Sequence, residues 1–138
     1  MKVLFLDIDG VLNSRSTSNF HELYPIDSYK AFLIGRIQLQ TGCEVVLSSS
    51  WRNHPEGVEN VSKRVVRLLD KTPWLDGCRG DEIDAWLNDH PEVDKYAILD
   101  DDMDMLVYQA PSFFKTTFEE GLTDEIAEAV INHLGRIE

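Results

Sequence analysis

Short runs of apolar residues recur along the chain, and the clearest of them stop abruptly at an acidic residue. Residues 2–6 (KVLFL) end at Asp7, and residues 96–99 (YAIL) end at Asp100. Apolar runs without alternation are typical of strands that are buried on both faces of a sheet. The strands that we predict from such runs cover residues 2–6, 44–47, 74–78, 96–99 and 113–117.

Between these runs, apolar residues recur at the spacing of a helix. We expect the first helix to open at Pro25 and to end at Gly42. Its apolar residues are Tyr29, Phe32, Leu33 and Ile37. Further helices are predicted over residues 55–70, over residues 81–88, and between a capping Thr123 and Gly135.

Strands that alternate with helices predict an α/β fold, in which one parallel sheet carries helices on both faces. The 138 residues fit a single domain, residues 1–138. In such sheets, ligands bind outside the carboxyl ends of the strands. Because Asp7, Ser48 and Asp100 each follow an apolar run, we expect these three side chains to meet at one edge of the sheet.

The charge of the chain narrows the range of partners. Asp and Glu number 25 and Lys and Arg number 13, so the formal net charge is −12. An acidic surface repels nucleic acid at long range, although a local site can still be basic. No apolar run approaches the roughly 20 residues of a membrane span, and Cys43 and Cys78 are most simply interpreted as reduced thiols of a cytoplasmic protein. No feature of the sequence specifies an oligomeric state.

Two aspartates leave the first predicted strand at a spacing of two residues. Asp7 and Asp9 repel each other unless one is protonated or a cation lies between them. Gly10 allows the chain to turn sharply after them. The alternative is that Asp9 and Gly10 form only a turn after the strand.

A second acidic cluster follows the strand that ends at Asp100. Its members are Asp100, Asp101, Asp102 and Asp104. If both clusters lie at one sheet edge, their oxygen atoms suit Mg²⁺ rather than zinc, because no His or Cys cluster accompanies them. Asp102 and Asp104 are equally well explained as solvated turn residues.

The sequence around these acids resembles the motifs of the haloacid dehalogenase-like (HAD) phosphohydrolases. FLDIDGVL (residues 5–12) resembles the first motif, VVLS (residues 45–48) the second, and ILDD (residues 98–101) the fourth. SSSWR (residues 48–52), RGDEI (residues 79–83) with the following WL, and GLT (residues 121–123) are similar to a subgroup. That subgroup includes phage proteins and the HAD domain of Swiss Army Knife RNA-repair proteins.

The resemblance implies a small Rossmann-like HAD fold and a covalent phosphatase mechanism. Asp7 would be the nucleophile, Asp9 the general acid and base, and Ser48 a hydrogen-bond donor to a phosphoryl oxygen. The family places a Lys or Arg before the helix that leads to the fourth motif. We assign that cation to Arg79, since Lys95 lies at the beginning of the strand, at the wrong end of the sheet.

The resemblance also implies a set of Mg²⁺ ligands. They are Asp7, the backbone carbonyl of Asp9, and an acid from the pair Asp100 and Asp101. Asp101 is favoured as the direct ligand, because the second acid of such a pair usually has that role in the family.

Residues that follow the second motif add candidate substrate contacts. We expect Ser49 and Arg52 to bind substrate beside Ser48 and Arg79, although Arg52 could equally pair with the acidic site for structural reasons. The tryptophans are predicted to lie in the core rather than to stack on bases; they are Trp51, Trp74 and Trp86.

The spacing of the motifs leaves no room for a cap domain, only for a small flap that holds Phe20 and Tyr24. An open site favours a large phosphorylated substrate, such as a nucleic-acid end or a phosphoprotein. The sequence therefore predicts a Mg²⁺-dependent phosphatase that acts on a nucleotide or nucleic-acid terminus. The alternatives are a broad small-molecule phosphatase and a catalytically silent module that binds a partner protein.

Overall fold

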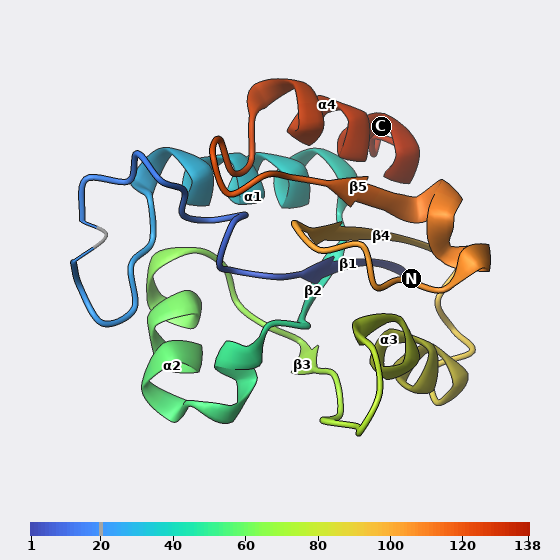
Figure 1. The fold of residues 1–138 in the computed structure, drawn as a ribbon. Helices are drawn as coiled ribbons and strands as arrows, with labels where there is room; N and C mark the ends of the chain where they lie inside the picture. The colour runs from blue at the N-terminus through green and yellow to red at the C-terminus, as the bar shows by residue number, and fades with distance from the viewer. Residues whose placement is uncertain (20) are drawn as a thin grey trace.

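The computed structural model describes residues 1–19 and 21–138. It shows a five-stranded parallel sheet with the strand order β3-β2-β1-β4-β5 (Figure 1). The strands are β1 (Lys2–Leu6), β2 (Glu44–Leu47), β3 (Asp70–Lys71), β4 (Lys95–Asp100) and β5 (Phe113–Lys115). The helices are α1 (Ser28–Thr41), α2 (Pro55–Arg64), α3 (Arg79–Asn88) and α4 (Asp124–Leu134), with 3-10 turns η1 (Ser50–Asn53) and η2 (Val107–Ser112).

Helices cover both faces of this sheet. Leu4 and Leu6 of β1 belong to a core that includes residues of α1, α2 and α4. Val3 and Phe5, which alternate with them, pack with α3 in a second core. In Figure 1, α1 and α4 lie on one side of the strands and α3 lies on the other. The predicted α/β class, with a parallel sheet and helices on both faces, is therefore confirmed.

The first helix begins later than the sequence pattern predicts. Asp27 rather than Pro25 opens α1, because the Asp27 carboxylate accepts hydrogen bonds from the backbone N–H groups of Tyr29 and Lys30. The buried side of α1 consists of Ala31, Leu33, Ile34, Ile37 and Thr41. Tyr29 and Phe32, which recur at helical spacing with Leu33 and Ile37, lie on the exposed side.

The predicted helix over residues 55–70 is present but ends six residues early, and the predicted strand over residues 74–78 was wrong. Helix α2 ends at Arg64, and the chain then extends so that Leu69 N–H donates to Val45 O at 2.8 Å. This contact leads the chain into β3, beside β2. Val65 and Leu68 still pack on the core, which is why their spacing resembled that of a continuing helix.

The remaining elements differ from their predicted bounds by a few residues. Helix α3 begins at Arg79 rather than at residue 81, and β5 ends at Lys115 rather than at residue 117. Thr123 caps α4 through its hydroxyl, as predicted. Among the described residues, the segment from residue 7 to residue 27 contains no helix or strand. None of the helices in the described part of the chain has the length and apolar character that a membrane span requires.

A lysine at the opposite end of β1 joins the ends of two helices. Lys2 Nζ donates to Gly135 O at 2.6 Å and to Thr41 O at 3.3 Å. These carbonyls lie at the carboxyl ends of α4 and α1, where unpaired C=O groups and the helix dipole favour a cation. A single partly buried ammonium therefore stabilises the ends of both helices.

We expect Lys2→Met to destabilise the fold by about 1–2 kcal/mol, which lowers Tm by roughly 3–8 °C. The matched control is Lys95→Met, since Lys95 is paired with Lys2 across the β1–β4 ladder but is exposed. Thermal unfolding followed by circular dichroism measures both. Equal losses in the two variants would contradict the role of Lys2.

Candidate active site

Three strand ends bring polar side chains together at the carboxyl edge of the sheet. Asp7 N–H donates to Leu99 O at 3.0 Å, and Ser48 N–H donates to Leu6 O at 2.9 Å. These bonds continue the pairing of β1 with its neighbours β4 and β2. Asp7, Ser48 and Asp100 therefore lie on adjacent strand ends, as the sequence pattern predicted.

A cluster of carboxylates lies at this edge. Asp7, Asp100 and Asp101 each offer an oxygen atom, and these atoms all lie within 4.8 Å of one another. Asp7 and Asp100 are buried, whereas Asp101 is partly exposed. An all-oxygen donor set of this kind fits Mg²⁺.

The two neighbouring acids of β4 and its extension differ in their partners. Asp100 Oδ2 accepts from the Arg79 guanidinium at 2.8 Å, and Asp100 Oδ1 accepts from Asp102 N–H at 3.0 Å. Within the described residues, the Asp101 carboxylate accepts no hydrogen bond and forms no ion pair. Its oxygens are therefore the more available of the two for a metal ion.

Gly10 leaves the room that the Asp101 carboxylate occupies. Gly10 has φ +81°, and a Cβ atom at this position would lie 2.1 Å from Asp101 Oδ2. Thr116 Oγ1 donates to Gly10 O at 2.6 Å, which fixes the turn after β1 to the segment that follows β5. A side chain at residue 10 would both strain the backbone and displace Asp101.

Asp9 stands apart from the carboxylate cluster. Its side chain accepts from Asn13 Nδ2 at 3.0 Å and from Trp51 Nε1 at 3.1 Å, and the residue is exposed. These two donors hold the carboxylate at the mouth of the site. The sequence analysis missed Asn13 and assigned Trp51 only to the core, where it is indeed buried; no spacing rule marks either as a partner of Asp9.

Arg79 supplies the cation nearest to the carboxylates. Its NH1 group donates to Asp100 Oδ2 at 2.8 Å and to Asp7 Oδ1 at 3.3 Å. Burial alone would lower the pKa of the guanidinium, but the charges of Asp7 and Asp100 raise it above its usual value. Lys95 lies at the other end of β4 and is exposed, so the geometry favours the choice of Arg79.

The loop after Asp101 supports Arg79 from outside the cluster. Asp104 Oδ2 accepts from Arg79 N–H at 3.0 Å, and Asp104 O accepts from Gly80 N–H at 3.1 Å. Asp104 therefore accepts hydrogen bonds from two of the unpaired N–H groups that begin α3. Asp102 is exposed, and among the residues that the structure describes its carboxylate accepts only from the neighbouring Met103 N–H. Neither acid belongs to the carboxylate cluster.

A second buried ion pair lies behind Arg79. Glu82 Oε2 is 2.7 Å from Arg52 NH2, and Glu82 Oε1 is 3.6 Å from Arg79 Nε. Arg52 and Glu82 are both almost fully buried, and burial is the main reason that the pKa of Arg52 falls below its usual value. Glu82 thus bridges the two arginines. The sequence analysis missed it, because an acid on a helix is usually solvated.

The side chains of Arg52 and Ser49 both form hydrogen bonds with backbone groups of the protein. Arg52 NH1 donates to Ser48 O at 2.9 Å and to Ser49 O at 2.8 Å. Ser49 Oγ accepts from Trp51 N–H and so caps η1. Of the two alternatives for Arg52, the geometry favours structural pairing, with Glu82 as its partner. Both residues support the end of β2.

The Ser48 hydroxyl is a buried donor without an acceptor. Among the described residues, no group forms a hydrogen bond with Ser48 Oγ. A buried hydroxyl without a partner is costly, so this group is suited to an oxygen atom of a bound ligand. Ser48 directly follows β2, which pairs with β1, so it lies beside Asp7 at the end of β1.

Burial at this edge raises the affinity of Asp7 and Asp100 for protons. Burial is the main cause of a pKa for Asp7 well above its ordinary value, the charge of Asp100 adds to this, and Arg79 opposes it. Burial likewise raises the pKa of Asp100 to about 6. Arg79 therefore offsets only part of the cost of ionising these two buried acids, and a bound cation would lower that cost further.

Comparison with known protein families matches residues 3–127 to the HAD domain in Swiss Army Knife RNA repair proteins. The chain belongs to this family. HAD domains in general hydrolyse phosphoesters and use Mg²⁺, which agrees with the oxygen cluster at the sheet edge. Neither the curated proteins nor the solved structures that were compared gave a match.

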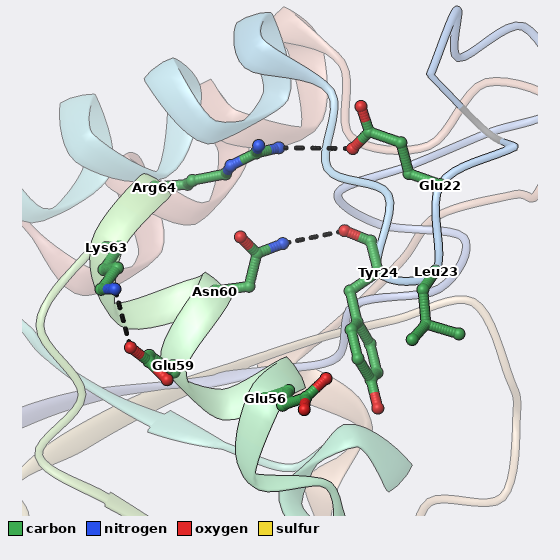
Figure 2. A pocket seen from close by; sticks show the side chains of 8 residues that line it. All are labelled: Glu22, Leu23, Tyr24, Glu56, Glu59, Asn60, Lys63 and Arg64. Atoms are coloured by element: carbon green, nitrogen blue, oxygen red, sulfur yellow. Dashed lines mark hydrogen bonds and ion pairs between the residues drawn. The ribbon is translucent and has the colours of Figure 1, made fainter.

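A cavity of about 350 Å³ between the flap and α2 of this HAD domain is not suited to phosphate (Figure 2). Its two cations are already paired, Lys63 with Glu59 at 2.7 Å and Arg64 with Glu22 at 3.6 Å, and another glutamate lines the wall. Tyr24 of the flap lines it too, and its ring packs edge-on against Trp51. Phe20, which the sequence placed in the same flap, lies outside the described residues.

We expect Asp7→Asn to raise the Tm of the metal-free HAD domain at pH 7, on the order of 5 °C. Because the folded-state pKa of Asp7 is raised above about 3.9, its contribution to stability is complete below pH 4 and is lost as pH rises through the raised value. The neutral side-chain amide of the Asp7→Asn variant does not ionise, so the variant avoids this loss of stability. The advantage of the variant should therefore grow between pH 4 and pH 7.

Thermal unfolding in a chelator, repeated across this pH range, measures the effect. In Mg²⁺ the wild type should gain more than the variant, because the variant lacks one anionic ligand. A wild type that is more stable than Asp7→Asn in chelator at pH 7 would contradict this account of the carboxylate cluster.

Proposed function

We propose that this HAD domain, acting as one unit over residues 1–138, is a Mg²⁺-dependent phosphatase that forms an aspartyl-phosphate on Asp7. The observation that carries the proposal is the meeting of three carboxylates with one guanidinium. Asp7, Asp100 and Asp101 converge within 4.8 Å, and Arg79 bonds two of them. The substrates that we propose are terminal phosphates of nucleotides or nucleic acids.

In the first step, a carboxylate oxygen of Asp7 attacks phosphorus while the bond from phosphorus to the leaving oxygen breaks. Asp9, which Asn13 and Trp51 hold at the exposed side of the site, gives its proton to that leaving oxygen. Splitting the reaction in two avoids a direct attack by water on the phosphate ester.

In the second step, water attacks the aspartyl-phosphate and Asp9 takes the proton of that water. The bond between Asp7 and phosphorus breaks, so both aspartates return to their starting states. Arg79 and the unpaired hydroxyl of Ser48 would hold the phosphoryl oxygens in both steps. Charge-assisted hydrogen bonds from a guanidinium are well suited to this task.

The residues that would hold Mg²⁺ are Asp7, the backbone carbonyl of Asp9, and Asp101, whose carboxylate has no partner in the described residues. Asp100 stays bonded to Arg79 and supports the cluster. Bound Mg²⁺ would supply the positive charge that lets a phosphate dianion approach an ionised carboxylate. The raised pKa values of Asp7 and Asp100 support the need for that charge.

Two observations support a nucleic-acid or nucleotide substrate. The described part of the chain contains no helix or strand between β1 and α1 that could close over the site, and an open site accommodates a large substrate. The family description also names RNA repair. The net charge of −12 opposes long duplexes, so short or single-stranded ends are favoured. Both cysteines are free thiols, which supports a cytoplasmic location.

Phosphate release by the purified protein tests the proposal. We expect Mg²⁺-dependent release that falls on the order of 10³-fold or more in Asp7→Asn, because the nucleophile is lost. The substrates are an aryl phosphate, nucleoside 3′- and 5′-monophosphates, and 3′-phosphorylated oligonucleotides. The matched control is Asp102→Asn, which removes an exposed acid outside the carboxylate cluster and should retain activity.

Three outcomes would count against parts of this proposal. Release without Mg²⁺, or unchanged release in Asp7→Asn, would overturn the mechanism. Turnover of small phosphates with none of the oligonucleotides would favour the broad small-molecule phosphatase. A folded protein that releases phosphate from none of them would favour the partner-binding module.

The bridging position of Glu82 yields a separate prediction. Glu82→Gln should lower kcat about 10- to 100-fold, because Arg79 loses the group that fixes its far side. It should also cost about 3–5 kcal/mol of stability, since two buried cations lose their shared anion. Steady-state kinetics well below Tm separate the two effects.

The double variant Arg52→Met/Glu82→Leu is the control for stability. Replacing a buried ion pair by apolar side chains usually restores much of the lost stability. If the double variant is stable and kcat stays low, the Arg52–Glu82 pair positions Arg79 or the Ser48 strand end, and the loss of kcat is not a consequence of lost stability. If kcat recovers along with stability, Glu82 has only a structural role.

A further inference from the structure

An exposed tryptophan and a lysine flank the buried Arg52–Glu82 pair. The Trp74 ring lies over the Arg52 guanidinium, with Cζ 4.8 Å from the ring centroid, yet Trp74 is 63% exposed. The prediction that Trp74 lies in the core was therefore wrong, whereas Trp51 and Trp86 are buried. One face of the Trp74 ring covers a cation, and much of the remaining surface is open to solvent.

Lys71 reaches the same arginine from the end of β3. Its Nζ donates to Arg52 O at 3.1 Å, and no carboxylate in the described residues forms an ion pair with it. An ammonium without a counter-ion is notable in a chain of net charge −12. Lys71 and Trp74 thus place a positive charge and an aromatic ring against one residue.

This pair lies beside the proposed phosphate site. Arg52 NH1 donates to the carbonyl of Ser48 at 2.9 Å, so the Trp74 ring rests on a side chain that supports the Ser48 strand end. The order β3-β2-β1 separates the ends of β3 and β1 by two strand spacings, about 10 Å. A nucleotide whose phosphate lies at Asp7 can bring its base toward Trp74 across this distance.

We propose that Trp74 and Lys71 form a binding subsite for the single-stranded nucleic acid that carries the terminal phosphate. A base stacks on the exposed face of Trp74, and the ammonium of Lys71 contacts a phosphodiester of the same strand. The inference rests on the proposed phosphatase function, and it identifies the substrate as an oligonucleotide end rather than a small phosphate ester.

The chemistry of the two side chains favours this ligand. Proteins that bind single strands combine aromatic platforms for bases with cations that follow the backbone. If Trp74 served only to cover the Arg52 guanidinium through a cation–π contact, its loss would affect every substrate of the site alike, whereas the loss of a stacking platform affects only substrates that carry a base. That difference separates a stacking platform from a structural cover.

Trp74→Leu removes both the aromatic face and the cation–π contact with Arg52, so the comparison of a substrate with a base and one without it tests the stacking role. We expect kcat/KM for a 3′-phosphorylated oligonucleotide to fall about 5- to 100-fold, with kcat/KM for glycerol phosphate unchanged. Trp74→Phe should retain most of the activity on the oligonucleotide. The control is Phe32→Leu on α1, since Phe32 is 62% exposed but does not contact Arg52.

A binding measurement tests the Trp74–Lys71 subsite without requiring the protein to turn over the substrate. In the Asp7→Asn background, the oligonucleotide should quench tryptophan fluorescence, and Trp74→Phe should abolish most of the quenching because the other two tryptophans are buried. Lys71→Gln should weaken binding and reduce the slope of log affinity against log salt by about one.

The two measurements distinguish failure of the subsite from failure of the proposed function. Quenching that needs Trp74, in a protein that releases no phosphate from any substrate, would overturn the phosphatase and leave the subsite standing. Turnover of the oligonucleotide that is equal in wild type, Trp74→Leu and Lys71→Gln would overturn the subsite. Equal losses on glycerol phosphate and the oligonucleotide would also overturn it, because Trp74 would then act through Arg52 alone.

Discussion

The crowding of carboxylates at the carboxyl edge is the constraint on which the rest of the site depends. Three acids present oxygens within 4.8 Å, and two of them are buried. Burial raises the pKa values of Asp7 and Asp100, and the negative charge of Asp101 adds to both shifts, so ionising both acids costs stability. A sheet edge evolved for stability alone would not place these charges together, and such a cost is typical of functional sites.

A connected series of alternating charges, rather than a single counter-ion, stabilises these carboxylates. Arg79 contacts the acids, Glu82 contacts Arg79, and Arg52 contacts Glu82. Arg52 in turn bonds the carbonyls of Ser48 and Ser49. The segment after β2 and the start of α3 are far apart in sequence, yet this series makes them one unit. Their positions are therefore coupled to the acids.

Part of this arrangement follows from the sequence and part does not. The convergence of Asp7, Ser48 and Asp100 was predictable, because apolar runs that stop abruptly mark the ends of buried strands. Periodicity reports only where apolar residues fall, so Val65 and Leu68 resembled a helix although they pack on the core from an extended segment. Residues such as Glu82 have no sequence signature, since their burial depends on a partner that the fold supplies.

The strand order also separates the charges along the edge. The acids lie at the ends of β1 and β4, whereas Arg52 and Lys71 lie after β2 and at the end of β3. Arg52 is buried and paired with Glu82, so of these two cations the exposed Lys71 is the one that a phosphorylated strand would contact on the β3 side. Because the anionic backbone avoids the acids, it should run toward β3, and the acids remain available for Mg²⁺. A chain of net charge −12 would in this way bind the end of a single strand through Lys71 and Trp74, whereas a longer polyanion would also meet acids such as the exposed Asp70 of β3.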